Sequence, residues 1–480
     1  MRTIAAILFV ATLAGCVDSD PSDPPAATTT APFVPDNVYG GGNASQQSLQ
    51  AIPRYFATGF NGPEPNMGVT SSGALFVSAY STIIRSRDGG ESWQPVQTHD
   101  PLMNSDPMMW VDPWTDHVYN APMFPPLACA LIYVSEDDGD SWTPVPTPNC
   151  GRTVYDHQKL ASGPPGPDAP PAAGSTHDSV LYMCYNGVAT TNCALSYDNG
   201  KTWPHDAPTN ANVVPPVGPT AGTLSGCGSG QNGHPTVSDN GIVAFGKTWG
   251  CAEPWLVYST DSGLTWTTVP GPQGKGGGSL DPEIAFDSQG TLYYHYQGSD
   301  HRAYVASTPD LGQTWNGPYD VTPPNVTSTA FNALAAGDDG RIGITFLGTT
   351  DGHEGNPSNA PSETRWHVWM VVSDNAASEA PTFTAYRVTP DDDPVQIGCV
   401  WLGGGSNPCR NMLDFIDGAI HPDGTFYTAY TEGCHEGCAF GANATDGDSR
   451  ARIAAVARLD GFSLYAPGPV GVAVETIGRP

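Results

Sequence analysis

The stretch Ser259-Thr-Asp261-Ser-Gly263-Leu-Thr265-Trp266 follows an eight-residue pattern, Ser/Thr-x-Asp-x-Gly-x-Ser/Thr-Trp, which occurs five times in the chain. The other copies begin at Ser86, Ser135, Ser196 and Thr308. Each copy follows a short apolar run, so it predicts the turn of a β-hairpin. In such a turn we expect Asp to accept hydrogen bonds from turn amides, Gly to take the positive-φ position, and Trp to begin the next strand.

The spacing of the copies predicts the architecture. Their aspartates follow one another at steps of 49, 61, 63 and 49 residues. A four-stranded propeller blade is the all-β unit of that size. Long helices are not expected, because 56 glycines and 47 prolines interrupt the chain. The sequence therefore predicts an all-β protein with a single β-propeller.

The repeated pattern resembles the Asp-box, or bacterial neuraminidase repeat, of the sialidase-like β-propeller family. The resemblance covers roughly residues 60 to 460 in a fold built from repeated blades. It implies that the boxes are structural hairpins away from the active face. It also implies that any activity is glycoside hydrolase-like, of the exo-sialidase type.

A second recurring phrase counts the blades. It runs from a polar residue through an apolar stretch and an Asp/Ser-x-Gly turn to a strand with an aromatic end, and it occurs seven times. We therefore favour seven blades, with six as the alternative because sialidases have six. In the last two blades the box is reduced to Val372-Ser-Asp374 and Arg458-Leu-Asp460.

The N-terminal residues predict export and lipid anchoring. Residues 1–15 combine a basic start with an apolar run too short to span a bilayer, and Leu13-Ala-Gly-Cys16 matches a bacterial lipoprotein cleavage box. Residues 16–48 are rich in Pro and Thr and predict a lipid-anchored, disordered tether. Residues 49–480 are expected to form the propeller. The predicted location is the bacterial cell envelope, with lipidation at Cys16.

Cysteine spacing agrees with an oxidising compartment. Apart from Cys16, ten cysteines fall into neighbouring pairs, which suggests five local disulfides, although sequence alone leaves the connectivity open. A metal site at Gly433-Cys-His-Glu-Gly-Cys438 is the alternative for the last pair. The pairs are Cys129/Cys150, Cys184/Cys193, Cys227/Cys251, Cys399/Cys409 and Cys434/Cys438.

The charge balance restricts the partners. The formal net charge of −30 opposes binding to nucleic acid and to anionic lipid surfaces. Contact with a membrane is therefore expected through the lipid anchor only. The expected partner is carbohydrate or another cell-surface ligand, and the propeller is expected to be a monomer.

Polar residues at the start of the seven inner strands are the candidate site, because those strand ends converge on the central channel. In the functional interpretation they line one solvent-filled mouth; in the alternative, each caps the turn before its own strand. No cofactor is certain, and a hard cation such as calcium is left open. The catalytic candidates are Asp106, His157, His234 and Asp281, and the substrate-binding candidates are Asn66, Asp156, Asn332, Asp414 and Asp417.

The sequence argues against ordinary sialidase chemistry. The family resemblance implies an arginine triad whose first member belongs to an Arg-Ile-Pro phrase on the first inner strand, but Met67 stands there. Ile52-Pro53-Arg54 lies upstream in the wrong order. Arg152, Arg302, Arg365 and Arg410 are the loop candidates for a clamp.

Two functions remain open. Paired carboxylates, with Glu64 and Glu283 beside the ring, could serve a glycosidase. The alternative is a non-catalytic surface propeller that binds glycan or protein. The sequence therefore predicts a sialidase-like lipoprotein that acts on or binds carbohydrate, and leaves open whether it is an enzyme.

Overall fold

A computed structural model describes most of the chain from residue 51 onward. The described ranges are 51–80, 82–98, 108–124, 129–148, 150, 157–170, 179–186, 191–204, 232–278, 281–403, 407, 409–434 and 452–466. The lipobox at Cys16 and the predicted tether lie outside them. No helix in these ranges has the length and apolar character needed to span a bilayer.

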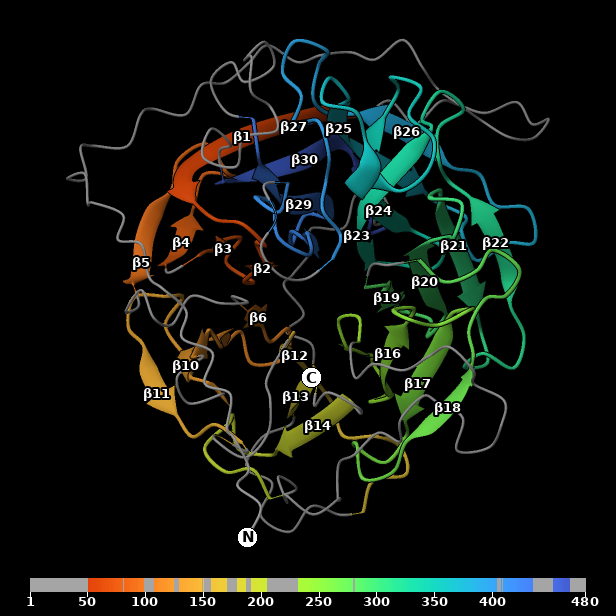
Figure 1. Cartoon of the computed structure of the whole chain (residues 1–480). Coiled ribbons are helices and arrows are strands. Elements are labelled where there is room, and N and C mark those ends of the chain that lie inside the picture. The colour runs from red at the N-terminus through yellow and green to blue at the C-terminus, as the bar shows by residue number, and fades with distance from the viewer. Residues whose placement is uncertain are drawn as a thin grey trace, which may run out of the picture.

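Seven antiparallel sheets are arranged around a common centre, so the predicted seven-bladed β-propeller is confirmed (Figure 1). In chain order, the strands of the first four blades are β2 (Met67–Val69), β3 (Leu75–Ala79), β4 (Thr82–Ser86) and β5 (Gln94–Thr98); β6 (Met109–Val111), β7 (Val118–Asn120), β10 (Ile132–Ser135) and β11 (Thr143–Val145); β12 (Lys159–Gly163), β13 (Val180–Asn186) and β14 (Thr191–Ser196); and β15 (Thr236–Val237), β16 (Val243–Lys247), β17 (Trp255–Ser259) and β18 (Thr267–Pro270).

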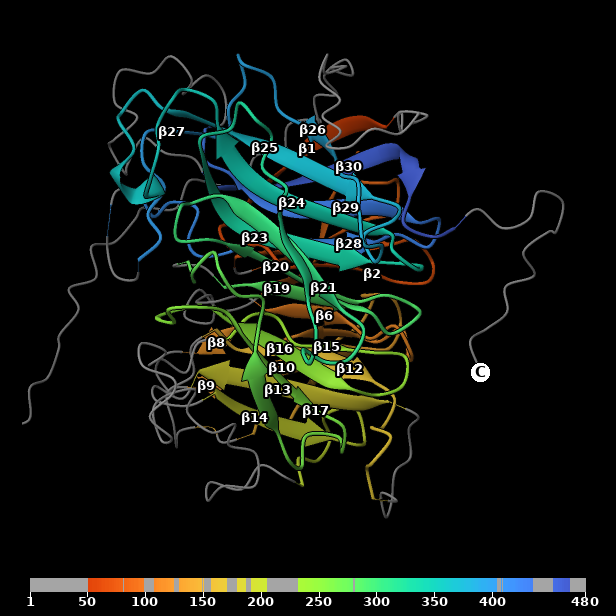
Figure 2. The ribbon, with the colours of Figure 1, turned by 90° about the vertical axis from the view of Figure 1, so that its right-hand side faces the viewer.

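The remaining three blades continue around the ring, and Figure 2 shows from the side how the strands of one blade lie in a row. Their strands are β19 (Glu283–Phe286), β20 (Leu292–Gln297), β21 (Ala303–Thr308) and β22 (Asn316–Asp320); β23 (Ser328–Ala336), β24 (Ile342–Thr349), β25 (Arg365–Ser373) and β26 (Thr384–Arg387), with β27 (Gln396–Ile397) paired to β25; and β28 (Asp417–Ile420), β29 (Thr425–Glu432), β30 (Ile453–Ser463) and β1 (Ile52–Asn61). A short pair, β8 (Met123–Phe124) and β9 (Cys129–Ala130), and one 3-10 turn, η2 (Pro357–Asn359), complete the described elements.

The ring is closed by the two ends of the described chain. The inner strands contact one another in the order β2, β6, β12, β15, β19, β23 and β28, and β28 returns to β2. In the seventh blade the outermost strand is β1, which pairs antiparallel with β30. The first strand of the chain thus completes the last blade.

The five boxes form the predicted hairpin turns. In the fourth blade, Asp261 Oδ1 accepts a hydrogen bond from the Thr265 amide at 2.8 Å, and Oδ2 accepts one from the Thr265 hydroxyl at 2.6 Å. The Ser259 hydroxyl donates to Asp261 at 2.7 Å and accepts from the Gly263 amide at 2.8 Å. The same four bonds recur in the other boxes.

The turn differs from the prediction in one respect. Both the box glycine and the residue before it have positive φ, for example 59° at Ser262 and 80° at Gly263. The box tryptophans are half-buried, and Trp266 donates its indole N–H to the Gly263 carbonyl at 3.1 Å.

The sixth blade keeps a reduced box, but one residue away from the predicted position. Asn375, not Asp374, takes the place of the box aspartate: its Oδ1 accepts from the Thr382 amide at 2.9 Å and from the Ser373 hydroxyl at 3.1 Å. In the seventh blade the expected turn at Asp460 is absent, because β30 runs on through it to Ser463.

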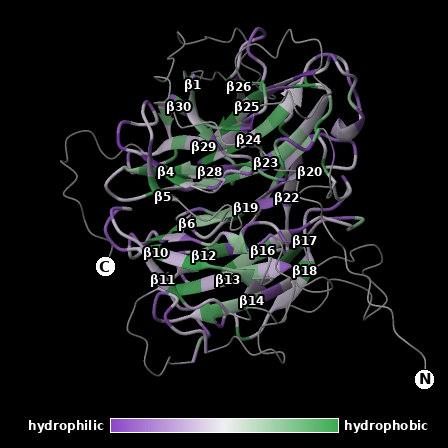
Figure 3. Ribbon diagram, turned by 60° about the vertical axis from the view of Figure 1, so that its left-hand side comes forward, coloured by the Kyte–Doolittle hydropathy of each residue, from purple (hydrophilic) through white to green (hydrophobic). Residues whose placement is uncertain are grey.

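Apolar residues are concentrated on the strands (Figure 3). The buried clusters show that the faces of neighbouring blades pack together. The clusters mix strands of adjacent blades, as when Tyr293 and Val305 of the fifth blade pack with Ile344 and Trp369 of the sixth. Burial between blades is therefore the main stabilising contribution to the ring.

Three of the five expected cysteine pairs are disulfides in the structure: Cys129–Cys150, Cys184–Cys193 and Cys399–Cys409. Cys251 and Cys434 are also disulfide-bonded, and their expected partners Cys227 and Cys438 lie outside the described residues. The thiolate metal site considered for Cys434 is therefore wrong for that residue.

Candidate functional site

Inner-strand starts from five blades, and a bulge within β23 of the sixth blade, converge at one end of the propeller. Together their residues form two sets of hydrogen bonds and ion pairs, which meet around Phe415 and which we term the hub. One set joins His157, Lys159, Asp281, Asn332, Arg410, Asp414 and Glu64. The other joins Asn66, His234, Glu283 and Asp417. Several positions at these starts have left-handed backbone: φ is 58° at Glu64, 49° at His157 and 60° at Leu413. Such conformations are costly for residues other than glycine, and they often occur at functional sites.

His157 and Lys159 of the third blade share one carboxylate of the fifth. Asp281 Oδ2 lies 2.6 Å from Lys159 Nζ and 3.0 Å from His157 Nδ1. Lys159 is fully buried, and its ammonium also donates to the Asn232 carbonyl at 2.9 Å. A buried cation at the start of the third inner strand is thus neutralised by a carboxylate of the fifth blade, on the far side of the fourth.

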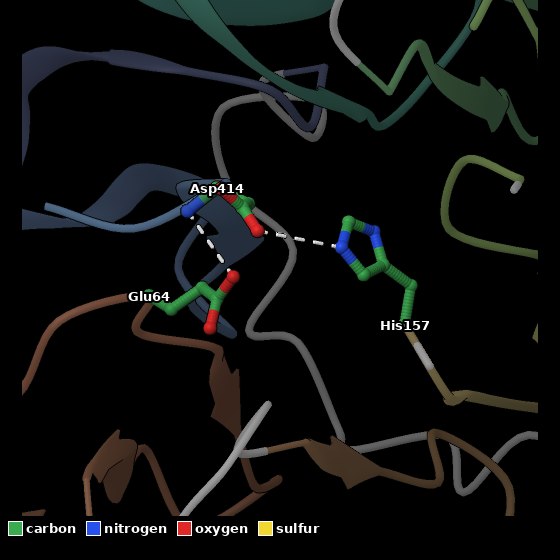
Figure 4. A group of neighbouring side chains, drawn as sticks. All are labelled: Glu64, His157 and Asp414. Carbon is green, nitrogen blue, oxygen red and sulfur yellow. Dashed lines mark hydrogen bonds and ion pairs between the residues drawn. The ribbon is translucent and has the colours of Figure 1, made fainter. Parts of the chain in front are cut away.

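The other ring nitrogen of His157 faces the seventh blade (Figure 4). His157 Nε2 lies 3.5 Å from Asp414 Oδ2, which also accepts from the Arg410 guanidinium. Glu64 of the first blade accepts a hydrogen bond from the Asp414 amide at 3.1 Å. One imidazole therefore bridges carboxylates of the fifth and seventh blades.

A second set of bonds crosses the centre through His234. Its Nδ1 lies 2.7 Å from Glu283 Oε1, and its Nε2 lies 3.1 Å from Asn66 Nδ2. Because the Asn66 amide nitrogen can only donate, Nε2 accepts and the ring proton is assigned to Nδ1. Asn66 Nδ2 also lies 3.4 Å from Asp417 Oδ2, and the Met67 amide donates to the same oxygen at 2.9 Å.

Phe415 packs in the middle of these groups. Its ring lies edge-on to His157 and His234, with centroids 6.2 and 5.5 Å apart, and Lys159 Nζ lies 5.4 Å from its centroid. Most hub side chains are buried, but those of His234, Asp414 and Arg410 are 12%, 15% and 21% exposed. The expected solvent-filled mouth is thus a packed polar hub with an accessible edge.

The hub shifts the pKa values of its carboxyl groups in opposite directions. Burial raises the pKa of Glu283 well above its ordinary value, and it lowers the pKa of His234 to about 4. At Asp281 burial opposes ionisation, but Lys159 and His157 outweigh it and hold the pKa below its ordinary value. His157 and Arg410 likewise lower the pKa of Asp414 against the effect of burial. Near neutral pH His234 is therefore neutral, ionisation of Asp281 and Asp414 is favoured, and ionisation of Glu283 is disfavoured.

A family model described as a BNR repeat-like domain matches residues 171–384. That match spans the middle blades, and the box hairpins extend the same repeat to the earlier ones. The match covers 214 of the 480 residues, from residue 171 to residue 384. This confirms the resemblance carried by the boxes. No curated protein matches the chain.

Solved structures similar to this BNR-repeat propeller are distant from it in sequence. The endosialidase of phage phi92 has 12% identity and a TM-score of 0.45, over 88% of this chain and 70% of that one. The intramolecular trans-sialidase from Ruminococcus gnavus has 14% identity and a TM-score of 0.39, over 82% and 93%. An α-L-arabinanase of Penicillium chrysogenum has 15% identity and a TM-score of 0.38, over 68% and 93%.

The BNR-repeat propeller brings most of the predicted site residues together. Asp106 and Asp156 lie outside the described residues, so their predicted roles stay predictions. Asn332 does not start a strand as expected: it lies at a bulge within β23 and donates to the Asp281 carbonyl at 2.9 Å.

The capping alternative accounts for little of the hub. Asp417 Oδ1 does accept from the adjacent Gly418 amide at 2.8 Å. The side chains of Asn66, His157, His234 and Asp281, however, bond to groups of other blades. These residues join blades across the centre instead of capping their own strands.

Sequence reasoning missed Lys159 and Phe415. Lys159 could have been found, because it begins the largely apolar phrase Lys159-Leu-Ala-Ser-Gly163. A charged side chain on a buried strand needs a partner. Phe415 carried no signal, because an aromatic residue between two aspartates is equally typical of a propeller core.

The described arginines form no triad at the hub. Arg54, the residue of the upstream Ile-Pro-Arg phrase, lies on the outer strand β1 and pairs with Asp460 at 2.6 Å. Arg302 pairs with Asp320 and Arg365 with Asp351, both at exposed positions. Of the four loop candidates, Arg410 reaches the hub and Arg152 lies outside the described residues.

Proposed function

We propose that the chain is an envelope-anchored propeller that acts on carbohydrate at the accessible edge of the hub. The observation that carries the proposal is that carboxyl groups of the two bonded sets in the hub have pKa values shifted in opposite directions. The charges of Lys159, His157 and Arg410 favour the ionised form of Asp281 and Asp414, whereas burial favours the protonated form of Glu283. Cleavage of a glycosidic bond by acid–base catalysis needs one carboxyl group of each kind.

His157 and Asp414 are the groups that would contact the substrate. Asp281 fixes the orientation of the His157 imidazole through Nδ1, so Nε2 is directed toward Asp414. Asp414 and Arg410 form the accessible edge, where a sugar hydroxyl finds both an acceptor and a donor. Asp281 and Lys159 are buried, and they act as positioning residues.

Sialic acid is not the substrate that this edge favours. Arg410 is held by Asp414, so its charge is partly neutralised before any substrate carboxylate arrives. The net charge of −30 also disfavours polyanionic substrates. We therefore propose a neutral glycan as the ligand.

Anchoring at the envelope is the part of the proposal that depends on the sequence of residues 1–16. The disulfides among the described residues support export to an oxidising compartment. Replacement Cys16→Ser should move the protein from the membrane fraction to the soluble fraction. A variant that stays with the membranes and is cleaved at the same position would contradict lipid attachment.

A non-catalytic glycan-binding propeller is the second candidate. The hub groups are largely buried and bonded to one another. Few of them are therefore accessible to a substrate, which favours binding without catalysis. In that case the edge formed by Asp414 and Arg410 would bind a sugar without turnover.

The test is an assay on neutral polysaccharides and a sialoside, with product release and glycan binding measured on the same samples. Replacement Asp414→Asn should lower turnover by about 10²- to 10⁴-fold. Asp392→Asn, at an exposed residue outside the hub, is the matched control and should leave turnover unchanged. Binding without turnover would select the second candidate, and rapid cleavage of the sialoside would contradict the argument from the arginines.

A further inference from the structure

The geometry points to a binding site for a divalent transition-metal ion, of the zinc or manganese type, formed by Glu64, His157 and Asp414 (Figure 4). Each residue offers one ligand atom, and these atoms all lie within 4.8 Å of one another. Glu64 and His157 are buried and Asp414 is half-buried. The three side chains come from the first, third and seventh blades, so closure of the ring creates the site.

The distances fit a shared ion. Two donor atoms bound at about 2.1 Å to a tetrahedral ion lie about 3.4 Å apart. His157 Nε2 and Asp414 Oδ2 are separated by 3.5 Å. The bond from the Asp414 amide to Glu64 Oε1, at 3.1 Å, holds the second carboxylate beside the first.

The surroundings of His157 supply an independent observation. A histidine that binds a metal usually donates its other ring N–H to a carboxylate, which fixes the tautomer. His157 Nδ1 lies 3.0 Å from Asp281 Oδ2, and Lys159 holds that carboxylate in turn. With the proton on Nδ1, the Nε2 lone pair faces an Asp414 oxygen, and a cation between these two atoms would stabilise both.

Elsewhere in the hub, one buried oxygen also lacks a protein partner. Asn66 is fully buried two residues after Glu64, and its Oδ1 has no hydrogen-bond partner among the described residues. A buried polar atom without a protein partner is commonly satisfied by a water or an ion, so the hub has room for a bound species beside its own side chains.

The donor set determines the class of ion. Calcium takes six to eight oxygen ligands, whereas imidazole nitrogen together with carboxylate oxygen suits zinc and manganese. A nitrogen-ligated ion therefore fits these residues better than the calcium left open by the sequence. Arg410 competes for Asp414 Oδ2, because both the guanidinium and the ion need that oxygen.

The experiment uses the mature protein, freed of metal with a chelator and titrated with Zn²⁺, Mn²⁺ and Ca²⁺ separately in a calorimeter. We expect one Zn²⁺ or Mn²⁺ per chain and a rise in Tm on binding.

Glu64→Gln should weaken metal binding at least 10-fold, and its amide oxygen can still accept from the Asp414 amide. Asp281→Asn should weaken it about 10- to 100-fold through the orientation of His157. Glu363→Gln, a carboxylate exposed at the surface, is the matched control and should bind as the wild type does.

Two further readouts keep the result decisive. If Glu64→Gln does not fold, Asp414→Asn takes its place. Independently, Arg410→Gln should tighten metal binding, because the guanidinium that competes for Asp414 is gone. The inference is overturned if the wild type binds neither Zn²⁺ nor Mn²⁺, if it binds Ca²⁺ only, or if Glu64→Gln and the control bind alike. Because the probe is the metal alone, these outcomes do not depend on whether the protein acts on carbohydrate.

Discussion

At the scale of single residues, the hub is a set of charges that are stable only because other blades supply their partners. Lys159 has no exposed surface, and its main partner Asp281 belongs to a blade more than a hundred residues away in sequence. Removing one member of a buried ion pair leaves the other uncompensated, which costs more than the pair itself contributes.

Replacement Lys159→Met should therefore destabilise the protein by about 3 to 5 kcal/mol, because the Asp281 carboxylate would lose its main cation. Urea unfolding at pH 7 measures this free energy. Lys201→Met, at an exposed lysine of the third box, serves as the control and should have little effect. Equal unfolding midpoints for the two variants would show that the buried pair does not stabilise the hub.

Glu432 at the end of β29 should make stability depend on pH. Burial raises its pKa from 4.5 to about 8, so between these values the folded chain binds more protons than the unfolded chain. Stability from this group is present at pH 4.5 and is lost as the pH rises through 8. Glu432→Gln keeps an acceptor for the Cys434 amide and removes this titration.

The variant should match the wild type near pH 5 and exceed it near pH 9 by about 1 to 3 kcal/mol. Thermal unfolding at both pH values, compared between the two proteins, checks this. A constant difference at both pH values would mean that Glu432 does not titrate in this range.

The residues of the hub were partly predictable. A polar residue before each inner strand indicates a position at the centre, and this was enough to place His157, His234 and Asp281 together. It did not predict their partners, because which blades face one another across the axis depends on the completed ring. Lys159 is the first residue of β12, and it could be assigned to the hub only once its distance to Asp281 was known.

At the scale of elements, the box hairpin was predictable in detail because its chemistry is local. The bonds of Asp261 reach only four residues along the chain, so sequence spacing alone specifies them. The reduced box of the sixth blade was misplaced because Asn375 bonds to Thr382, seven residues away, through a longer loop. Such a loop has no fixed spacing by which to recognise it.

Replacement Asp261→Ala should destabilise the protein by about 1 to 3 kcal/mol, because the turn amide and hydroxyls lose their acceptor. Asp261→Asn keeps an oxygen for the Thr265 amide and should cost less. Thermal unfolding ranks the two variants, and glycan binding should be unchanged in both. Selective loss of glycan binding by a stable Asp261→Ala protein would contradict a purely structural role for the boxes.

At the scale of the whole molecule, the ring depends on β1, the only described strand that joins a blade from the other end of the chain. The sequence predicted the number of blades but not this closure, because the phrase around Phe56 resembles no box. In the structure Phe56 is buried opposite Val456 of β30, and the Arg458 guanidinium lies 5.3 Å from the centroid of its ring.

Replacement Phe56→Ala should therefore loosen the ring at its point of closure, at a cost of about 3 to 5 kcal/mol. Hydrogen exchange should increase in β1 and β30 and then in the adjoining blades, since opening one junction frees both neighbours.

Tyr319→Ala on β22, an outermost strand that closes no junction, is the matched control, and its effect should stay within the fifth and sixth blades. If exchange in Phe56→Ala increases in β1 alone while β28, β29 and β30 stay protected, β1 covers the last blade without holding the ring together. Because the hub joins the first and seventh blades through Asn66 and Asp417, a loosened closure should also weaken any ligand bound there.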